Sequence, residues 1–135
     1  MQQIEFELPE YKKGCHLITH IVEKMTEKMM PQTGMMNLFI KHTSAALSIN
    51  ENADPDVRTD LSKSLDMIAP ENQPFYEHVL EGADDMPAHI KTTLIGCSIN
   101  IPISNGRLNL GTWQGIYLCE FRNHGGKRKI VATIW

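Results

Sequence analysis

The chain has 135 residues, the length of one domain that buries roughly two thirds of its unfolded surface. Its 13 basic and 16 acidic side chains give a formal net charge of −3, which offers no general attraction to nucleic acid or an anionic membrane. No apolar run approaches the roughly 20 residues that span a bilayer, and the start lacks a signal-peptide pattern. We therefore expect one cytoplasmic domain over residues 1–135, with neither nucleic acid nor membrane as a partner. Three cysteines, in no paired metal-ligand motif, are expected to be reduced: Cys15, Cys97 and Cys119.

The first fifty residues predict a strand, a helix and a further strand region. Alternating apolar and polar residues over 4–8 predict a half-buried strand that stops at a proline. Thr19 is expected to cap a helix whose apolar residues follow at helical spacing. Strand-like alternation covers 35–49 and is interrupted near His42. His42 is therefore expected within or beside a sheet.

Two more helices are expected in the middle of the chain. Asp54-Pro55 predicts a helix start, because Asp accepts a hydrogen bond from an unpaired N–H and Pro at the first helical position loses no needed donor. This helix is expected to end before Pro70, and a shorter one is expected over 84–95. The first helix carries an apolar stripe formed by Val57, Leu61, Leu65 and Ile68. Replacing Leu61 or Leu65 by alanine is expected to lower the free energy of unfolding by roughly 2–5 kcal/mol.

The last third of the chain predicts antiparallel strands. Asn105-Gly106 is a strong hairpin signal. Nothing repeats at a fixed period, and no linker-like stretch divides the chain. The expected fold class is α+β, with an antiparallel β-sheet and two or three helices packed on it. The expected strands cover 97–103, 107–110, 112–122 and 127–135.

Side chains suited to metal and phosphate chemistry gather in a few stretches. Carboxylates, imidazoles, a lysine and a tryptophan beside small turn residues could hold a metal ion, grip a phosphate and cover a flat ring. A small-molecule site is therefore expected. The residues that predict it are His42, Asn50, Glu51, Asp54, the run from Asp84 to Lys91, Trp113 and Gln114.

Several separate motifs together resemble the YjbQ family over essentially the whole chain, in the family's order and spacing. The motifs are His42–Leu47, Asn50–Val57, Glu81–Lys91, Gly106–Leu108, Leu110–Gly115 and Glu120. Members of that family are described as secondary thiamine-phosphate synthases. The resemblance implies an α+β homotrimer with its site near a subunit boundary, and a small phosphorylated metabolite as the partner molecule.

The implied reaction joins a pyrimidine-methyl diphosphate to a thiazole phosphate and releases diphosphate. The charge on the leaving diphosphate must be neutralised by a divalent metal and by cationic side chains. The start of the helix opened by Pro87 adds backbone N–H groups that suit a phosphate oxygen. His89 and Lys91 are roughly 200° apart around this helix and so point to different sides. His42 or His89 could carry a proton near neutral pH.

Each expected site residue is given one or more of three roles. The expected catalytic residues are His42, His89 and Glu51. The expected substrate and phosphate contacts are Asn50, Asp84, Asp85, Lys91, Arg107, Trp113, Gln114 and Glu120. The expected ligands of a divalent metal, Mg²⁺ or Zn²⁺, are His42, His78, His89 and Asp54.

Several alternatives remain open from the sequence. Asp54 could be a helix cap and no ligand. Trp113 and Gln114 point to opposite faces of a strand, so only one can face a given pocket. Glu120 lies on an apolar strand and needs a partner, either Arg122, Arg128 or a group from another subunit. At the level of function, the alternative is a metal- or phosphometabolite-binding protein, or a metal-dependent hydrolase, with synthase activity only as a side reaction.

Overall fold

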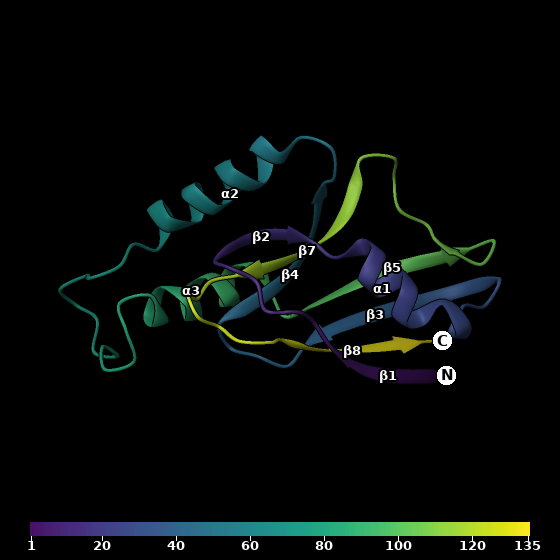
Figure 1. Ribbon diagram of the computed structural model, residues 1–135, viewed down its shortest axis with the longest axis horizontal. Coiled ribbons are helices and arrows are strands. Elements are labelled where there is room, and N and C mark those ends of the chain that lie inside the picture. Colours follow the sequence, from purple (N-terminus) through teal and green to yellow (C-terminus); the bar gives the residue numbers. More distant parts are fainter.

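The computed structural model describes residues 1–135 and consists of two antiparallel sheets and three α-helices (Figure 1). The larger sheet has the order β1-β8-β3-β5-β6, and the smaller has the order β2-β7-β4. The larger sheet contains β1 (Gln2–Glu7), β3 (Thr33–Ile40), β5 (Ser98–Ser104), β6 (Arg107–Leu108) and β8 (Lys129–Ile134). The smaller sheet contains β2 (Gly14–Leu17), β4 (Ala45–Glu51) and β7 (Gln114–Glu120).

The helices differ in how closely they approach the sheets (Figure 1). They are α1 (Thr19–Thr26), which a 3₁₀ turn over Glu27–Met29 continues, α2 (Pro55–Ile68) and α3 (Asp85–Ile95). α3 packs on β4 and buries several residues, whereas α2 lies on the outside next to β2 and buries none. A long loop connects α2 to α3. No helix has the length and apolar character needed to cross a membrane.

The main core lies where the two sheets face each other. Alternate residues of each strand point inward, so the core collects apolar side chains from strands that are far apart in sequence. A second, smaller core underlies α2 and α3 and includes Ala88 and Phe121. The largest fully buried side chains of the main core include Met36, Leu38, Ile40, Leu47, Ile101, Ile116, Leu118 and Ile130.

Most expected elements are confirmed, and the α+β class with them. Asp54 caps α2 through a 2.9 Å hydrogen bond from the Asp56 N–H to its Oδ1. Three details differ from expectation. β2 (Gly14–Leu17) lies in a stretch for which no strand was expected. The strands form two sheets and not one, because β7 leaves the meander to pair with β2 and β4. Thr19 is the first helical residue and not the cap, since its hydroxyl accepts a hydrogen bond from the Ile116 N–H.

Candidate functional site

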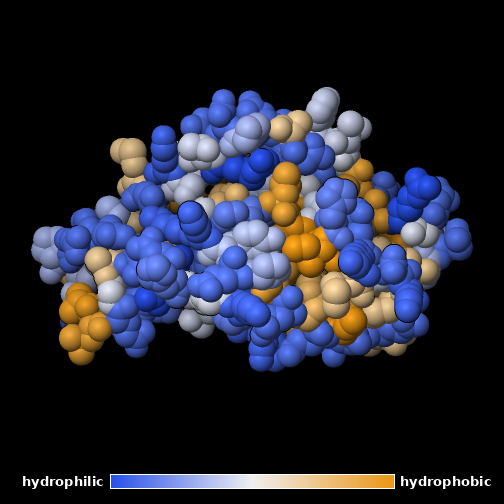
Figure 2. All heavy atoms as spheres, in the orientation of Figure 1, coloured by the Kyte–Doolittle hydropathy of each residue, from blue (hydrophilic) through white to orange (hydrophobic).

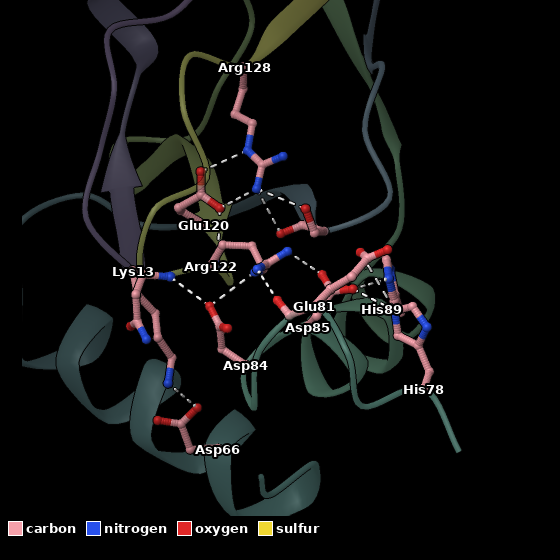
Figure 3. Close-up of polar contacts among 12 residues, drawn as sticks. Lys13, Asp66, His78, Glu81, Asp84, Asp85, His89, Glu120, Arg122 and Arg128 are labelled. Carbon is pink, nitrogen blue, oxygen red and sulfur yellow. Dashed lines mark hydrogen bonds and ion pairs between the residues drawn. The ribbon is translucent and has the colours of Figure 1, made fainter. Parts of the chain in front are cut away.

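The carboxylate of Asp85 is the centre of a polar group at the start of α3, which Figure 3 shows. Its side chain is 2 % exposed. Oδ2 lies 2.6 Å from His78 Nε2 and 3.0 Å from His89 Nε2, and Oδ1 accepts a hydrogen bond from Arg122. We call Asp84, Asp85, His78, His89 and Arg122 the Asp85 cluster.

Three separate segments supply the cluster. Asp85 and His89 are four residues apart on α3 and therefore lie on one face of the helix. His78 comes from the loop between α2 and α3, and Arg122 follows the end of β7. The start of α3 thus becomes a meeting point for a helix, a loop and a strand end.

The orientation of His89 is fixed from its other nitrogen. Nδ1 lies 2.8 Å from the Thr43 carbonyl oxygen, which can only accept, so Nδ1 carries the proton of a neutral ring. Nε2 of the neutral ring then presents a lone pair toward Asp85 Oδ2, and two acceptors face each other at 3.0 Å. A proton or a metal cation between these atoms resolves this repulsion. The carbonyl contact is the one that commonly orients metal-binding imidazoles.

One arginine holds both acidic residues at the start of α3. Arg122 Nε donates to Asp84 Oδ2 at 3.0 Å, and the Asn123 N–H donates to the same oxygen at 2.9 Å. Burial by itself raises the pKa of Asp84, but these two hydrogen bonds outweigh it and the pKa lies below its ordinary value. The pKa of Asp85 is also lowered, because His78, His89 and Arg122 outweigh burial. Both groups are therefore carboxylates at neutral pH.

The donor set fits a divalent transition metal. One ligand atom each from His78, Asp85 and His89 lies within 4.8 Å of the others. Two imidazole nitrogens and one carboxylate oxygen suit Zn²⁺, Mn²⁺ or a similar ion better than Mg²⁺, which prefers oxygen. Asp84 and Asp85, both paired with Arg122, occupy this helix start, where the sequence predicts a phosphate oxygen.

A hollow of about 570 Å³ opens beside His89. It is lined by nine residues, among them His42, Phe39, Thr92 and Thr93. Phe39 is 42 % exposed and offers a flat apolar face. We call this cavity the His42 hollow; because His89 lines it, a molecule bound there would lie next to the Asp85 cluster.

His42 lies at the His42 hollow and outside the metal-binding group. Its Nε2 accepts a hydrogen bond from the Lys129 N–H at 2.8 Å, so Nδ1 carries the proton of the neutral ring. Burial, followed by the nearby charge of Arg128, lowers the pKa of His42 and favours that neutral ring. This arrangement makes His42 a hydrogen-bond donor through Nδ1 and leaves no free nitrogen for a metal or a proton.

Lys91 points away from His89, as the helical spacing predicts, but it does not face a phosphate site. It is buried, and its Nζ donates to Asp66 of α2 at 2.5 Å. Lys13 contacts the same carboxylate oxygen at 2.9 Å. Lys91 therefore ties α3 to α2 beneath the surface (Figure 3 shows Lys13 and Asp66).

Glu120 finds its partner within the chain. It is fully buried and pairs with Arg128, whose Nε and Nη2 donate to its two oxygens at 2.7 and 2.5 Å. Arg128 Nη2 also donates to the Ser44 carbonyl and hydroxyl. A β-carbon at Gly125 would collide with both charged groups, so only glycine fits there. Glu120 therefore belongs to a buried ion pair that holds the structure together.

The remaining expected residues do not join the Asp85 cluster within one chain. Asn50 and Glu51 lie at the far end of β4, where Glu51 pairs with Gln114. Glu51 is six residue steps along the strand from Ala45, or about 20 Å. The side chain of Gln114 accepts a hydrogen bond from the Gly111 N–H, and Trp113 is 65 % exposed. Neither residue lines the His42 hollow. Two others lie elsewhere: Asp54 at the α2 cap and Arg107 in a separate hollow with Glu23 and Glu27.

Arg122 is the cluster member that sequence reasoning did not place. The sequence offers Arg122 as one possible partner of Glu120, and its backbone N–H does donate to Glu120 Oε2 at 3.2 Å. Its guanidinium instead turns to Asp84 and Asp85, 38 and 37 residues earlier. The only sequence signal for this pairing is the adjacency of two acidic residues, because a buried pair of carboxylates needs a cation.

These features define a small two-sheet α+β protein with a histidine and carboxylate cluster at the start of a helix. The chain belongs to the YjbQ family: the family model described as UPF0047 protein YjbQ-like matches residues 3–135.

Relatives and solved structures agree over nearly the full length. The UPF0047 protein YjbQ of Salmonella typhimurium is 50% identical over 94% of this chain and 92% of its own. A solved YjbQ/UPF0047 family structure from Clostridium acetobutylicum has 42% identity and a TM-score of 0.87, covering 98% of this chain and 99% of its own. A hypothetical protein from Aeropyrum pernix has a TM-score of 0.88 at 26% identity, covering 100% and 98%.

Proposed function

We propose that this protein is a metal-dependent enzyme acting on phosphorylated heterocycles, and that its reaction is the synthesis of thiamine phosphate. It would join a pyrimidine-methyl diphosphate to a thiazole phosphate and release diphosphate. The metal-binding geometry carries the first part of the proposal: two imidazole nitrogens and a buried carboxylate oxygen converge beside an open hollow. The motifs shared with the YjbQ family supply the choice of reaction.

Four residues of the Asp85 cluster have a task in this proposal. His78, Asp85 and His89 would hold a divalent ion, which supplies positive charge to the leaving diphosphate. Arg122 keeps Asp85 ionised and in position. The Thr43 carbonyl fixes the ring of His89, so that Nε2 would be free to bind the ion.

The His42 hollow supplies the contacts that flat heterocycles need. Phe39 offers an apolar face against which a ring can lie. Nδ1–H of His42 can donate to a ring nitrogen or a phosphate oxygen, because the Lys129 N–H holds the opposite nitrogen. His42 would thus position the substrate while remaining neutral.

One observation favours a second reaction. A donor set with two imidazoles suits Zn²⁺, which lowers the pKa of bound water and supports hydrolysis. A metal-dependent hydrolase of phosphorylated metabolites is therefore the second candidate. It would use the same cluster and the same hollow.

Metal affinity tests the site before any reaction is assumed. Isothermal titration calorimetry with Zn²⁺ and Mn²⁺ should show tight binding to the metal-free native chain and a loss of more than about tenfold in Asp85→Asn. Asp54→Asn is the matched control, because Asn also caps a helix well and the control changes a carboxylate outside the cluster. Equal affinity in both variants would rule out the cluster as the metal site.

Activity then separates the two reactions. The native protein, loaded with each metal in turn, is supplied with both phosphorylated heterocycles, and thiamine phosphate and free phosphate are measured. Thiamine phosphate that disappears in Asp85→Asn supports the synthase. Phosphate release without thiamine phosphate supports the hydrolase. If neither product exceeds background with any metal, the proposed enzyme function fails.

We also propose a homotrimer with the site near a subunit boundary. Five large apolar side chains are exposed at the end of α2 and in the following loop, and Figure 2 shows a compact orange group at the end of the molecule where that loop lies. Soluble monomers rarely expose a large contiguous apolar surface. The exposed residues are Met67, Ile68, Phe75, Val79 and Leu80. A neighbouring copy could cover them and bring Glu51 and Gln114 toward another chain's Asp85 cluster.

A further inference from the structure

A second hollow, of about 390 Å³, lies between the first turns of α2 and the start of β2. Its lining is strongly basic and contains no carboxylate. Arg58 and Lys63 come from α2, while Lys13 and His16 come from β2 and the residue before it. We call this cavity the Arg58 hollow. It shares no residue with the Asp85 cluster or the His42 hollow.

Arg58 lines this hollow and also reaches toward the smaller core. Its side chain is half-buried, and its Nη1 is enclosed beneath the surface. Burial raises the pKa of the Tyr117 hydroxyl, and the nearby guanidinium of Arg58 offsets part of that rise. Arg58 therefore contributes its positive charge to the lining of the hollow.

The charges around the Arg58 hollow favour an anion as its occupant. The acidic residues nearest on the same helix, Asp56 and Asp60, do not line the hollow. Asp66 contacts Lys13 at 2.9 Å and is also the partner of Lys91, so it neutralises only part of the local charge. The lining therefore keeps an excess of positive charge, although the whole chain carries a formal net charge of −3.

Hydroxyl groups complete the set of donors. Thr59 and Ser62 line the Arg58 hollow beside Arg58. A guanidinium, ammonium groups and hydroxyls together suit a group with several acceptor oxygens around one centre, because each oxygen can take a separate hydrogen bond. A phosphate group has that form.

We propose that the Arg58 hollow binds a phosphate group, held by the positive charges of Arg58 and Lys63 and by the hydroxyls of Thr59 and Ser62. The site is separate from the proposed metal centre and does not depend on the proposed reaction. The phosphate could be inorganic phosphate or the terminal group of a phosphorylated metabolite, since both present the same oxygens.

Binding of inorganic phosphate to the native, metal-free protein tests the site directly. Removing metals with a chelator prevents phosphate from binding at the Asp85 cluster. Titration followed by phosphorus NMR should give saturable binding that weakens at least about tenfold, or about 1.4 kcal/mol, in Arg58→Gln. Lys63→Gln should weaken it less, because Lys63 is exposed. Lys24→Gln, on the exposed side of α1, is the matched control and should bind as the native chain does.

A second measurement uses the native chain, so it does not depend on whether Arg58→Gln folds. Cys15 lines the Arg58 hollow and Cys97 lines the His42 hollow, so their alkylation by iodoacetamide reports on the two places separately. Phosphate should slow alkylation of Cys15 and leave Cys97 unchanged. Absence of saturable phosphate binding, unchanged affinity in Arg58→Gln, or protection of Cys97 alone would each overturn the proposal.

A parallel titration with glycerol phosphate distinguishes the two sources. Affinity equal to or above that of inorganic phosphate supports a site for the phosphate end of a metabolite. Much weaker affinity supports a site for the free ion.

Discussion

Asp84 and Asp85 place two carboxylates side by side at a helix start, and a single guanidinium serves both. Arg122 meets Asp84 through Nε and Asp85 through Nη1, so its planar fork separates the two negative charges while binding each. The Asn123 N–H gives Asp84 a second donor. Lysine could not replace Arg122, because an ammonium lacks the fixed fork that reaches both residues.

Acid should weaken the fold through Asp84. Its pKa in the folded chain is below the ordinary 3.8, so the unfolded chain takes up this proton first as pH falls. The contribution of Asp84 to the free energy of unfolding is therefore complete above pH 3.8 and is lost as pH drops through the folded pKa. Urea unfolding, with chelator present, should show Asp84→Asn less stable than the native chain at neutral pH.

The difference between the two proteins should shrink as the pH is lowered past 3.8. Asp54→Asn serves as the control, since Asn keeps the helix cap. A difference that stays constant or grows in acid would contradict the role given to Asp84.

Sequence reasoning works at single residues when the cause is local. Asp54 was predicted as a cap because its partner is two residues away, and a buried Glu120 was predicted to need a cation because burial of a lone carboxylate is costly. Lys91 shows the limit. Helical spacing predicts that the Lys91 side chain points to another side of α3 than His89 does. Only the packing of α2 against the rest of the chain shows that Asp66 lies on the side that Lys91 faces.

At the scale of elements, α2 is attached more loosely than its apolar stripe predicts. Leu61 and Leu65 are only partly buried, Ile68 is 65 % exposed, and no residue of the helix is buried. The helix is held by the contacts of Asp66 with Lys13 and Lys91 and by the edge of the smaller core.

Replacing a buried leucine by alanine should therefore lower the free energy of unfolding more in strand β4 than in helix α2. Leu47→Ala, in the main core at 1 % exposure, should lower the free energy of unfolding by roughly 2–5 kcal/mol. Leu65→Ala should cost less than about 2 kcal/mol, below the range expected from sequence. Guanidinium unfolding of dilute protein measures both. Equal costs would mean that another copy of the chain covers α2.

The strands were predictable one by one, but their assignment to sheets was not. Alternation tells which residues of a strand point inward, and Asn105-Gly106 fixes a local hairpin between β5 and β6. The pairing of β7 with both β2 and β4 joins residues about a hundred positions apart in one case. No local pattern distinguishes that partner from the neighbouring strand β8. The Asp85 cluster was missed in part for the same reason, since His78 and Arg122 approach from remote segments.

At the scale of the whole molecule, the apolar end formed by α2 and its following loop predicts self-association. Sedimentation velocity should show a species near three times 15.3 kDa. Leu80, 96 % exposed in the single chain, should be covered in this assembly, so Leu80→Asp should shift the protein toward single chains. Met25→Asp, on α1 away from this surface, is the control. A stable single-chain species in the native protein would refute the trimer.

Gly125 restricts how the connection between β7 and β8 can change over time. Because a β-carbon at this position would approach both members of the buried Glu120 and Arg128 pair, a larger residue would have to displace that pair. Single substitutions at Gly125 should therefore be strongly disfavoured in saturation mutagenesis of the connection, whereas its exposed neighbours Asn123 and His124 should tolerate diverse residues.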